Sequence, residues 1–156
     1  MKSFIVAAAI ATSLGSAGQA LAADDSGIMK PVNGFIDATG KAADINRAAS
    51  YWTANQSMVD EFAPYHWTGP TAVRAWWAGF LADSKKSGAT DAVVTSTAAP
   101  HIVQTPSHAY VVQPARVTLK VKGHPVREDG LLTFALDRTK AGWKIASCAW
   151  ASQAKP

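Results

Sequence analysis

Acid–base chemistry is suggested by one stretch, residues 60–77, which reads DEFAPYHWTGPTAVRAWW. Its acids, tyrosine and histidine can each exchange a proton, and apolar side chains such as Phe62 and Trp67 lie among them. A carboxylate with apolar neighbours has a raised pKa, which suits it to act as a general base. Asp60 is therefore the first candidate catalytic residue.

Structural interpretations of the same stretch stay open. The Asp60 carboxylate could accept backbone N–H groups of the next turn, or it could form an ion pair with Arg74. Tyr65 and Trp67 could line a pocket and bind a ligand, or they could fasten the loop to the following helix, since aromatic side chains bury large areas.

His101 is the second candidate catalytic residue, because histidine titrates near neutral pH and could relay a proton to Asp60. The alternative is a histidine that is hydrogen-bonded to a strand carbonyl and takes no part in chemistry. Tyr110 and Trp150 lie in apolar strand segments and are candidate ligand-binding residues, together with Tyr65 and Trp67. No cluster of Cys and His has the spacing of a zinc site, and no nucleotide-binding glycine motif is present, so the sequence predicts neither metal nor cofactor.

Helical patterns come first along the chain and strand patterns follow. Helical periodicity is expected over residues 31–40, in a short segment capped by Asp44, and from Pro70 to Gly88. Strand patterns are expected over residues 92–103, 110–113, 115–122, 126–136 and 143–150. This order predicts an α+β fold, in which N-terminal helices pack on a curved antiparallel sheet and form a cone with an apolar pocket.

The N-terminal residues have the pattern of a secretory signal. Lys2 precedes an apolar run, and Ala20 and Ala22 supply the small residues of a cleavage site. We expect a cleaved signal peptide over residues 1–22, a disordered leader over residues 23–30, and one domain over residues 31–152. The protein would then be exported, to the periplasm or the medium; the alternative is a retained N-terminal anchor.

Charge and cysteine content exclude several classes of protein. The chain has 15 Lys and Arg against 11 Asp and Glu, and the excess is too scattered for a nucleic-acid-binding arm. After the signal, no apolar stretch approaches the roughly 20 residues of a membrane span. Cys148 is the single cysteine, so no internal disulfide can form, and its apolar strand predicts a buried structural thiol.

Four segments in this order resemble the NTF2-like superfamily, in particular its SnoaL-like and ketosteroid-isomerase-like branches. FIDATGKAADI is similar to the first helix and its turn, and VDEFAPYHWTGPTAVRAWW is similar to the strand, loop and helix that follow. HAYVVQPARVTLKVKGHPVREDG resembles the paired central strands, and LLTFALDRTKAGWKIASCAWA resembles the closing hairpin. The resemblance covers roughly residues 31–152.

This resemblance implies a conical pocket for a small hydrophobic molecule and metal-independent acid–base catalysis of the isomerase, dehydratase or cyclase type. Asp60 stands where steroid-isomerase relatives place their base, and His101 looks like a pocket histidine of the dehydratase branch. The oxyanion donors of the isomerases are replaced by Ile36 and Leu132, which cannot donate a hydrogen bond. The alternative is a non-catalytic module that binds a ligand or a protein. The resemblance also implies a homodimer that pairs through outer sheet faces, for which Val117, Leu119, Val121, Trp143 and Ile145 are candidates.

Overall fold

The computed structural model describes residues 25–40 and 43–153, so the predicted signal peptide lies outside the described residues. The helices are α1 (Asp25–Thr39), α2 (Ile45–Ser50) and α3 (Ala72–Ser87). The strands are β1 (Trp52–Val59), β2 (His66–Gly69), β3 (Ala89–Ser96), β4 (His101–Gln104), β5 (His108–Val121), β6 (His124–Thr139) and β7 (Gly142–Ser152).

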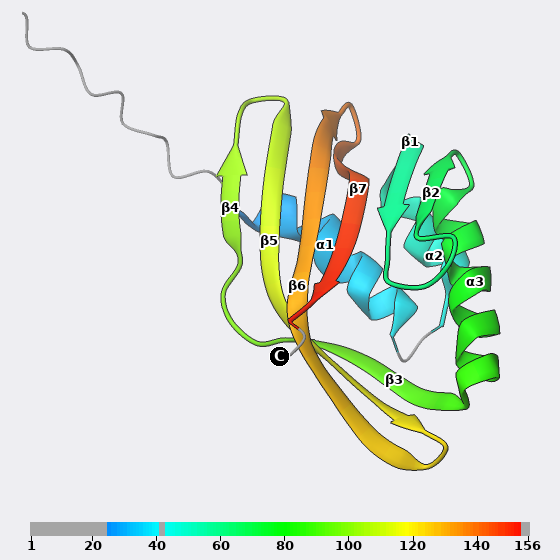
Figure 1. The fold of residues 1–156 in the computed structure, drawn as a ribbon. Helices are drawn as coiled ribbons and strands as arrows, with labels where there is room; N and C mark the ends of the chain where they lie inside the picture. Colours follow the sequence, from blue (N-terminus) through cyan, green and yellow to red (C-terminus); the bar gives the residue numbers. More distant parts are fainter. Residues whose placement is uncertain (1–24, 41–42, 154–156) are drawn as a thin grey trace, which may run out of the picture.

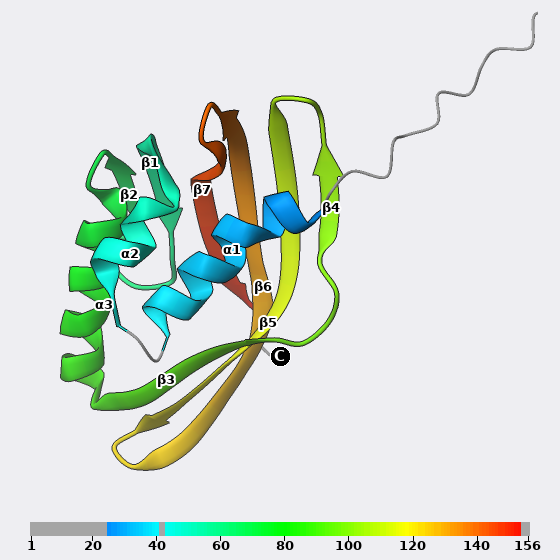
Figure 2. The same ribbon diagram turned by 180° about the vertical axis from the view of Figure 1, so that it is seen from behind.

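One curved sheet forms the frame of the molecule. Its strand order is β2-β1-β7-β6-β5-β3, and β4 pairs with β5 beyond the end of β3. Every pairing is antiparallel except that of β1 with β7, which is parallel. Figure 2 shows α1 crossing one face of the sheet, here called the inner face, while Figure 1 shows the uncovered outer face. The predicted α+β cone is thus confirmed.

The core lies between α1 and the inner face. Ile28, Val32 and Phe35 recur along one side of α1, and each is at most 4% exposed. They meet the long strands, where Phe134 of β6 and Ile145 of β7 are fully buried. Complete burial of side chains of this size contributes about 1.5–3 kcal/mol each, so the α1–sheet contact is a main source of stability.

The prediction of a disordered leader over residues 23–30 is wrong from residue 25 onward. Asp25 to Lys30 form the first turns of α1, and Ile28 in this segment is fully buried. The helical spacing of apolar residues in the sequence begins only after Pro31. Pro31 instead lies inside the helix, where burial of Ile28 one turn earlier offsets the missing N–H.

Two of the strand predictions need correction. The expected strand over residues 92–103 is divided into β3 and β4, and the two expected strands on either side of Pro114 are one strand, β5. The carbonyl of Pro114 accepts a hydrogen bond from the Thr97 N–H (2.9 Å), in the segment between β3 and β4. The backbone nitrogen and carbonyl of a strand residue point to the same side, so the nitrogen of Pro114 also points toward the segment between β3 and β4. Its lack of an N–H therefore removes no hydrogen bond between paired strands.

The predicted helix ends at Asp44 and Gly88 are confirmed. Asp44 caps α2, with its Oδ1 accepting the N–H groups of Asn46 (3.1 Å) and Arg47 (3.0 Å). Gly88 ends α3 in the left-handed conformation (φ 76°), which glycine adopts without a steric penalty. The first cap fixes where α2 begins, and the second fixes where the chain leaves α3 for β3.

Candidate active site

Asp60 directly follows β1 and is half-buried on the inner face. Met58, two residues earlier, is 3% exposed and pairs with Cys148 of β7. Because side chains alternate along a strand, Asp60 continues the side of Met58, whereas Val59 between them is exposed. The carboxyl group therefore stands at the end of the inner face, next to α3.

Both carboxylate oxygens of Asp60 accept a hydrogen bond. Oδ2 accepts the indole N–H of Trp76 on α3 at 2.7 Å, and Oδ1 accepts the backbone N–H of Glu61 at 2.7 Å. Burial raises the pKa of the Asp60 carboxyl group, while these two hydrogen bonds act in the opposite direction. The proposed ion pair with Arg74 does not form, because Arg74 donates to Asn46 of α2 at 2.6 Å.

Aromatic side chains from α1 and α3 surround the Trp76 ring. Its ring centre lies 5.9 Å from that of Phe35, 5.8 Å from that of Trp77 and 6.1 Å from that of Phe80, onto which it stacks. Phe62, in the loop after Asp60, lies 6.3 Å from Phe80. The carboxyl group is thus bonded to one edge of a wall of aromatic rings.

Cys148 of β7 pairs with Met58, two residues before Asp60, and is a buried thiol, as predicted. Burial raises its pKa well above the ordinary value, and the charge of Asp60 raises it further. Only the thiolate is nucleophilic, so Cys148 contributes packing and no covalent chemistry to this site.

Two candidate ligand-binding residues share the side of the molecule that holds Asp60. Trp67 of β2 is 9% exposed and packs on Phe62, with ring centres 5.1 Å apart. Trp150 of β7 is half-buried, and its ring lies against Gly130 of β6, where an added Cβ atom would approach it to 2.6 Å. Both indoles are therefore held by neighbouring side chains or backbone.

The other three candidates are placed elsewhere. His101 and Tyr110 are exposed, and their neighbours Ile102 and Val111 pair with each other on the inner face. Alternation then puts His101 and Tyr110 on the outer face. Strands β7, β6 and β5 separate β1 from β4, so the structure does not bring His101 to Asp60. Tyr65 is 59% exposed in the loop before β2.

The positions that the resemblance assigns to oxyanion donors hold hydrocarbon side chains inside the cone. Ile36 of α1 packs against the core, and Leu132 of β6 is 9% exposed on the inner face.

Within residues 25–40 and 43–153, no group of three His, Cys, Asp or Glu side chains is placed to hold a metal ion. Among the described helices, none is long and apolar enough to cross a bilayer.

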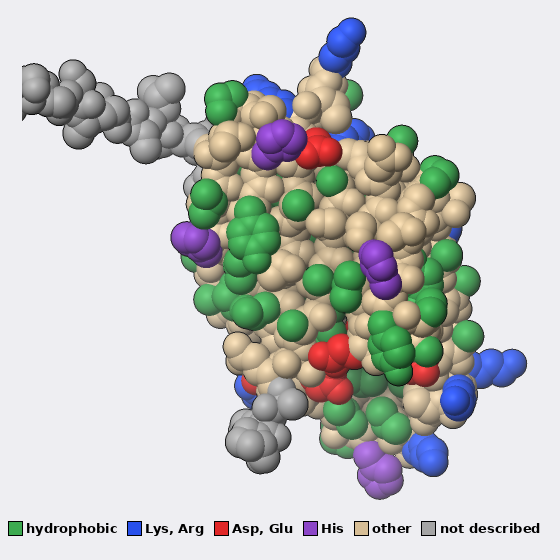
Figure 3. Space-filling model, turned by 45° about the horizontal axis from the view of Figure 1, so that its top comes forward, with side chains coloured by type: hydrophobic (Ala, Val, Ile, Leu, Met, Phe, Trp, Pro, Cys, Tyr) green, Lys and Arg blue, Asp and Glu red, His purple; other side chains and the backbone are tan. Residues whose placement is uncertain are grey.

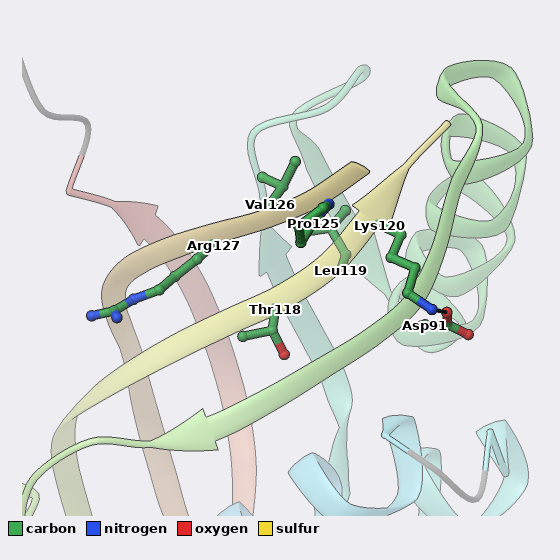
Figure 4. A pocket seen from close by; sticks show the side chains of 7 residues that line it. All are labelled: Asp91, Thr118, Leu119, Lys120, Pro125, Val126 and Arg127. Carbon is green, nitrogen blue, oxygen red and sulfur yellow. Dashed lines mark ion pairs between the residues drawn. The ribbon is translucent and has the colours of Figure 1, made fainter. Parts of the chain in front are cut away.

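A separate hollow of about 330 Å³ lies where β3 meets the β5–β6 hairpin (Figure 4). It is lined by Asp91, Thr118, Leu119, Lys120, Pro125, Val126 and Arg127. Lys120 pairs with Asp91 at 2.9 Å, and Arg127 donates to Asp129 at 2.9 Å. Both cations that line the hollow are thus already paired, and none of its lining residues belongs to the Asp60 site.

Asp60 stays a predicted catalytic residue, and the sequence does not reveal the side chains that contact it. Helical periodicity places Trp76 on the apolar side of its helix and Phe35 in the first helix, and neither pattern indicates a contact with Asp60. Nothing in the spacing of Asp60 and Trp76 marks a contact, because the angle between β1 and α3 decides which helix residue reaches the carboxyl group. The proximity of Cys148 likewise depends on the pairing of β1 with β7.

Comparison with known proteins gives a consistent family match. The family model described as a SnoaL-like domain matches residues 28–150. A search of the curated proteins finds no match to the sequence.

Solved structures share the fold at low sequence identity. A hexachlorocyclohexane dehydrochlorinase of Novosphingobium barchaimii is 12% identical, with a TM-score of 0.71, over 83% of this chain and 86% of that one. An NTF2-like superfamily protein of Salmonella enterica is 16% identical, with a TM-score of 0.68, over 85% and 95% of the two chains. A ketosteroid isomerase-like protein of Erwinia carotovora is 16% identical, with a TM-score of 0.65, over 83% and 96%.

Proposed function

Because the chain belongs to the SnoaL-like domain family, we propose that it binds a small hydrophobic molecule inside its cone and uses Asp60 as a general base. The observation that supports this proposal is the placement of Asp60. Its carboxyl group is half-buried, has no cationic partner among its hydrogen bonds, and adjoins a wall of aromatic rings. A carboxylate that is poorly solvated and not neutralised is a stronger base than one in water.

The reaction that suits this site is an elimination. Proton abstraction beside a carbonyl places negative charge on an oxygen, and Ile36 and Leu132 leave that charge without donors at the expected positions. In an elimination, the base takes a proton from carbon, and the C–H electron pair becomes the new C=C bond. The leaving group departs from the neighbouring carbon with its own electron pair, so no oxyanion has to be stabilised. Loss of water or of halide meets this requirement.

Halide release tests the proposal directly. We expect the mature chain to release chloride from a chlorinated cyclohexane that carries hydrogen and chlorine on adjacent carbons, as measured by ion chromatography. Asp60→Asn should lower the rate about 100-fold or more, since general bases contribute at least that much. Asp83→Asn, an exposed acid on α3, is the matched control and should leave the rate unchanged. An Asp60→Asn chain that turns over a substrate at the wild-type rate would contradict the proposal.

The second candidate function is a non-catalytic binding module. The observation that favours it is the packing of Trp76 and Trp150 onto their neighbours, which fills part of the space inside the cone. A ligand that raises the melting temperature of wild type and of Asp60→Asn equally, without turnover in either, would select this alternative.

We also propose a homodimer through the outer face of the sheet. Val103 and Tyr110 pair across β4 and β5 and are 54% and 47% exposed. Figure 3 shows hydrophobic side chains spread over this face, with Lys and Arg at its periphery, as in an interface with a polar rim. The residues that the sequence suggests for this contact continue the inner-face alternation of buried Ala115 and Ile145 and so do not lie on the outer face: Val117, Leu119, Val121 and Trp143.

Export to the periplasm or the medium remains our proposal for localisation, and residues 1–22 support it by their pattern alone. We expect the mass of the mature chain to correspond to residues 23–156. An unprocessed N-terminus in the cell extract would contradict cleavage at this site.

A further inference from the structure

The contact between Trp76 and Asp60 is too specific to be packing alone. The Trp76 ring packs against Phe35, Trp77 and Phe80. In the structure, the ring is turned so that its Nε1 donor lies 2.7 Å from Oδ2 of Asp60, the distance of a hydrogen bond to a charged acceptor. Contacts from three aromatic rings hold the indole in that orientation.

The donor is neutral, and this has a chemical consequence. Arg74 lies only two residues away on α3, yet it donates to Asn46. A guanidinium on Asp60 would neutralise the carboxylate and weaken it as a base, whereas an indole N–H fixes an oxygen atom and adds no charge. Each carboxylate oxygen accepts one hydrogen bond from the protein, which leaves acceptor capacity for a proton from a ligand.

We propose that Trp76 is a positioning residue for Asp60: its indole N–H holds Oδ2 in one place against the aromatic wall without supplying a counter-charge. This inference rests on the proposed role of Asp60 as a base. It goes beyond that role because it assigns a task to a residue that the helical pattern marks only as core.

The test uses the ligand-free mature chain and two matched variants. Trp76→Phe keeps an aromatic ring and removes the N–H donor. Trp77→Phe makes the same change at the next residue, whose ring packs on Trp76 and Phe80 but makes no hydrogen bond to Asp60. The side-chain ¹³C resonance of the Asp60 carboxyl group gives its titration midpoint, and three-bond couplings give its χ1 rotamer population.

Loss of the donor should raise the Asp60 midpoint, because the N–H stabilises the charged form. We expect Trp76→Phe to lower the acid dissociation constant about tenfold and to mix the χ1 rotamers. Trp77→Phe should change neither. A midpoint that stays or falls in Trp76→Phe, or that rises equally in both variants, would show that the indole only buries the carboxyl group and would overturn the proposal.

A wild-type measurement keeps the proposal testable if Trp76→Phe does not fold. The indole N–H resonance of Trp76 should shift with pH at the midpoint of Asp60, and the shift should vanish in Asp60→Asn. A resonance that does not respond to the titration of Asp60 would overturn the proposal. None of these measurements needs a substrate, so a chain that catalyses nothing would still give a readable answer.

Discussion

Asp60 is the residue at which stability and pH are most directly linked. Its pKa is raised in the folded chain, so on increasing pH the unfolded chain ionises first. The folded state then holds more protons than the unfolded state, and the free energy of unfolding falls as pH rises. The fall begins at the ordinary carboxyl pKa and is complete once the raised pKa has been passed.

We therefore expect the wild type to lose stability relative to Asp60→Asn as pH rises through this window, since Asn cannot ionise. Urea unfolding of both chains between pH 3 and pH 8 measures the difference, and the other acids cancel because both chains share them. A difference that is constant, or that changes in favour of the wild type, would contradict a raised pKa for Asp60.

Gly130 lies at a position that has no room for a side chain. A Cβ atom there would lie 2.5 Å from the Ala151 carbonyl oxygen and 2.6 Å from the Trp150 ring. We expect Gly130→Ala to lower the free energy of unfolding by about 1–3 kcal/mol, as overpacked core positions do. Trp150→Ala in the same chain should recover only part of this loss, because the carbonyl contact stays. A fully tolerated Gly130→Ala would show that β6 and β7 can move apart.

At the residue scale, sequence reasoning could identify the acid but not its surroundings. Asp60 is a candidate because apolar side chains such as Phe62 and Trp67 follow it closely in the sequence, which is a local pattern. The placement of His101 could not be predicted, since one step along a strand decides which face a side chain occupies. Strand β4 spans only His101–Gln104, too short for its alternation to fix that step.

Helix α2 is the element that depends most on a single cap. It spans six residues, and Asp44 satisfies two of its first N–H groups. We expect Asp44→Ala to lower the free energy of unfolding by about 1 kcal/mol. Asp44→Asn should lower it much less, because asparagine is also a good N-cap. Asp37→Ala, an exposed acid on α1, is the control. Chemical denaturation measures all three, and equal effects at both positions would argue against a role for the cap.

Helix ends that are marked by a capping residue could be predicted from the sequence. Elements that depend on contacts with distant parts of the chain could not. Gly88 and Asp44 marked helix ends correctly, because caps are chosen by nearby residues. The start of α1 and the existence of β2 were missed. Ile28 is helical because it packs against the sheet, and β2 exists because it pairs with β1, so both depend on contacts that no short window contains.

The outer face of the sheet sets the behaviour of the whole molecule. If it is the dimer contact, Tyr110→Lys should place a charge at an apolar interface and shift the dimer toward monomer. Sedimentation at micromolar concentration measures this, with Lys120→Ala, on the β5–β6 hairpin, as a control that should stay dimeric. A wild-type chain that is monomeric under these conditions would contradict the proposal.

The whole fold was predictable from the order of its elements, because helices followed by strands with these turns fit few architectures. The parallel pairing of β1 with β7 was not predictable, since it joins the start of the domain to its end and leaves no trace in either segment alone.

The pairing of β1 with β7 also determines when the sheet can form in full. β7 lies between β1 and β6, so it is the strand that connects the β1–β2 hairpin to the rest of the sheet. A growing chain cannot join these two parts until residues 142–152 have left the ribosome. Loss of β7 would therefore divide the sheet at its middle, and β1, which leads into Asp60, would lose its parallel partner.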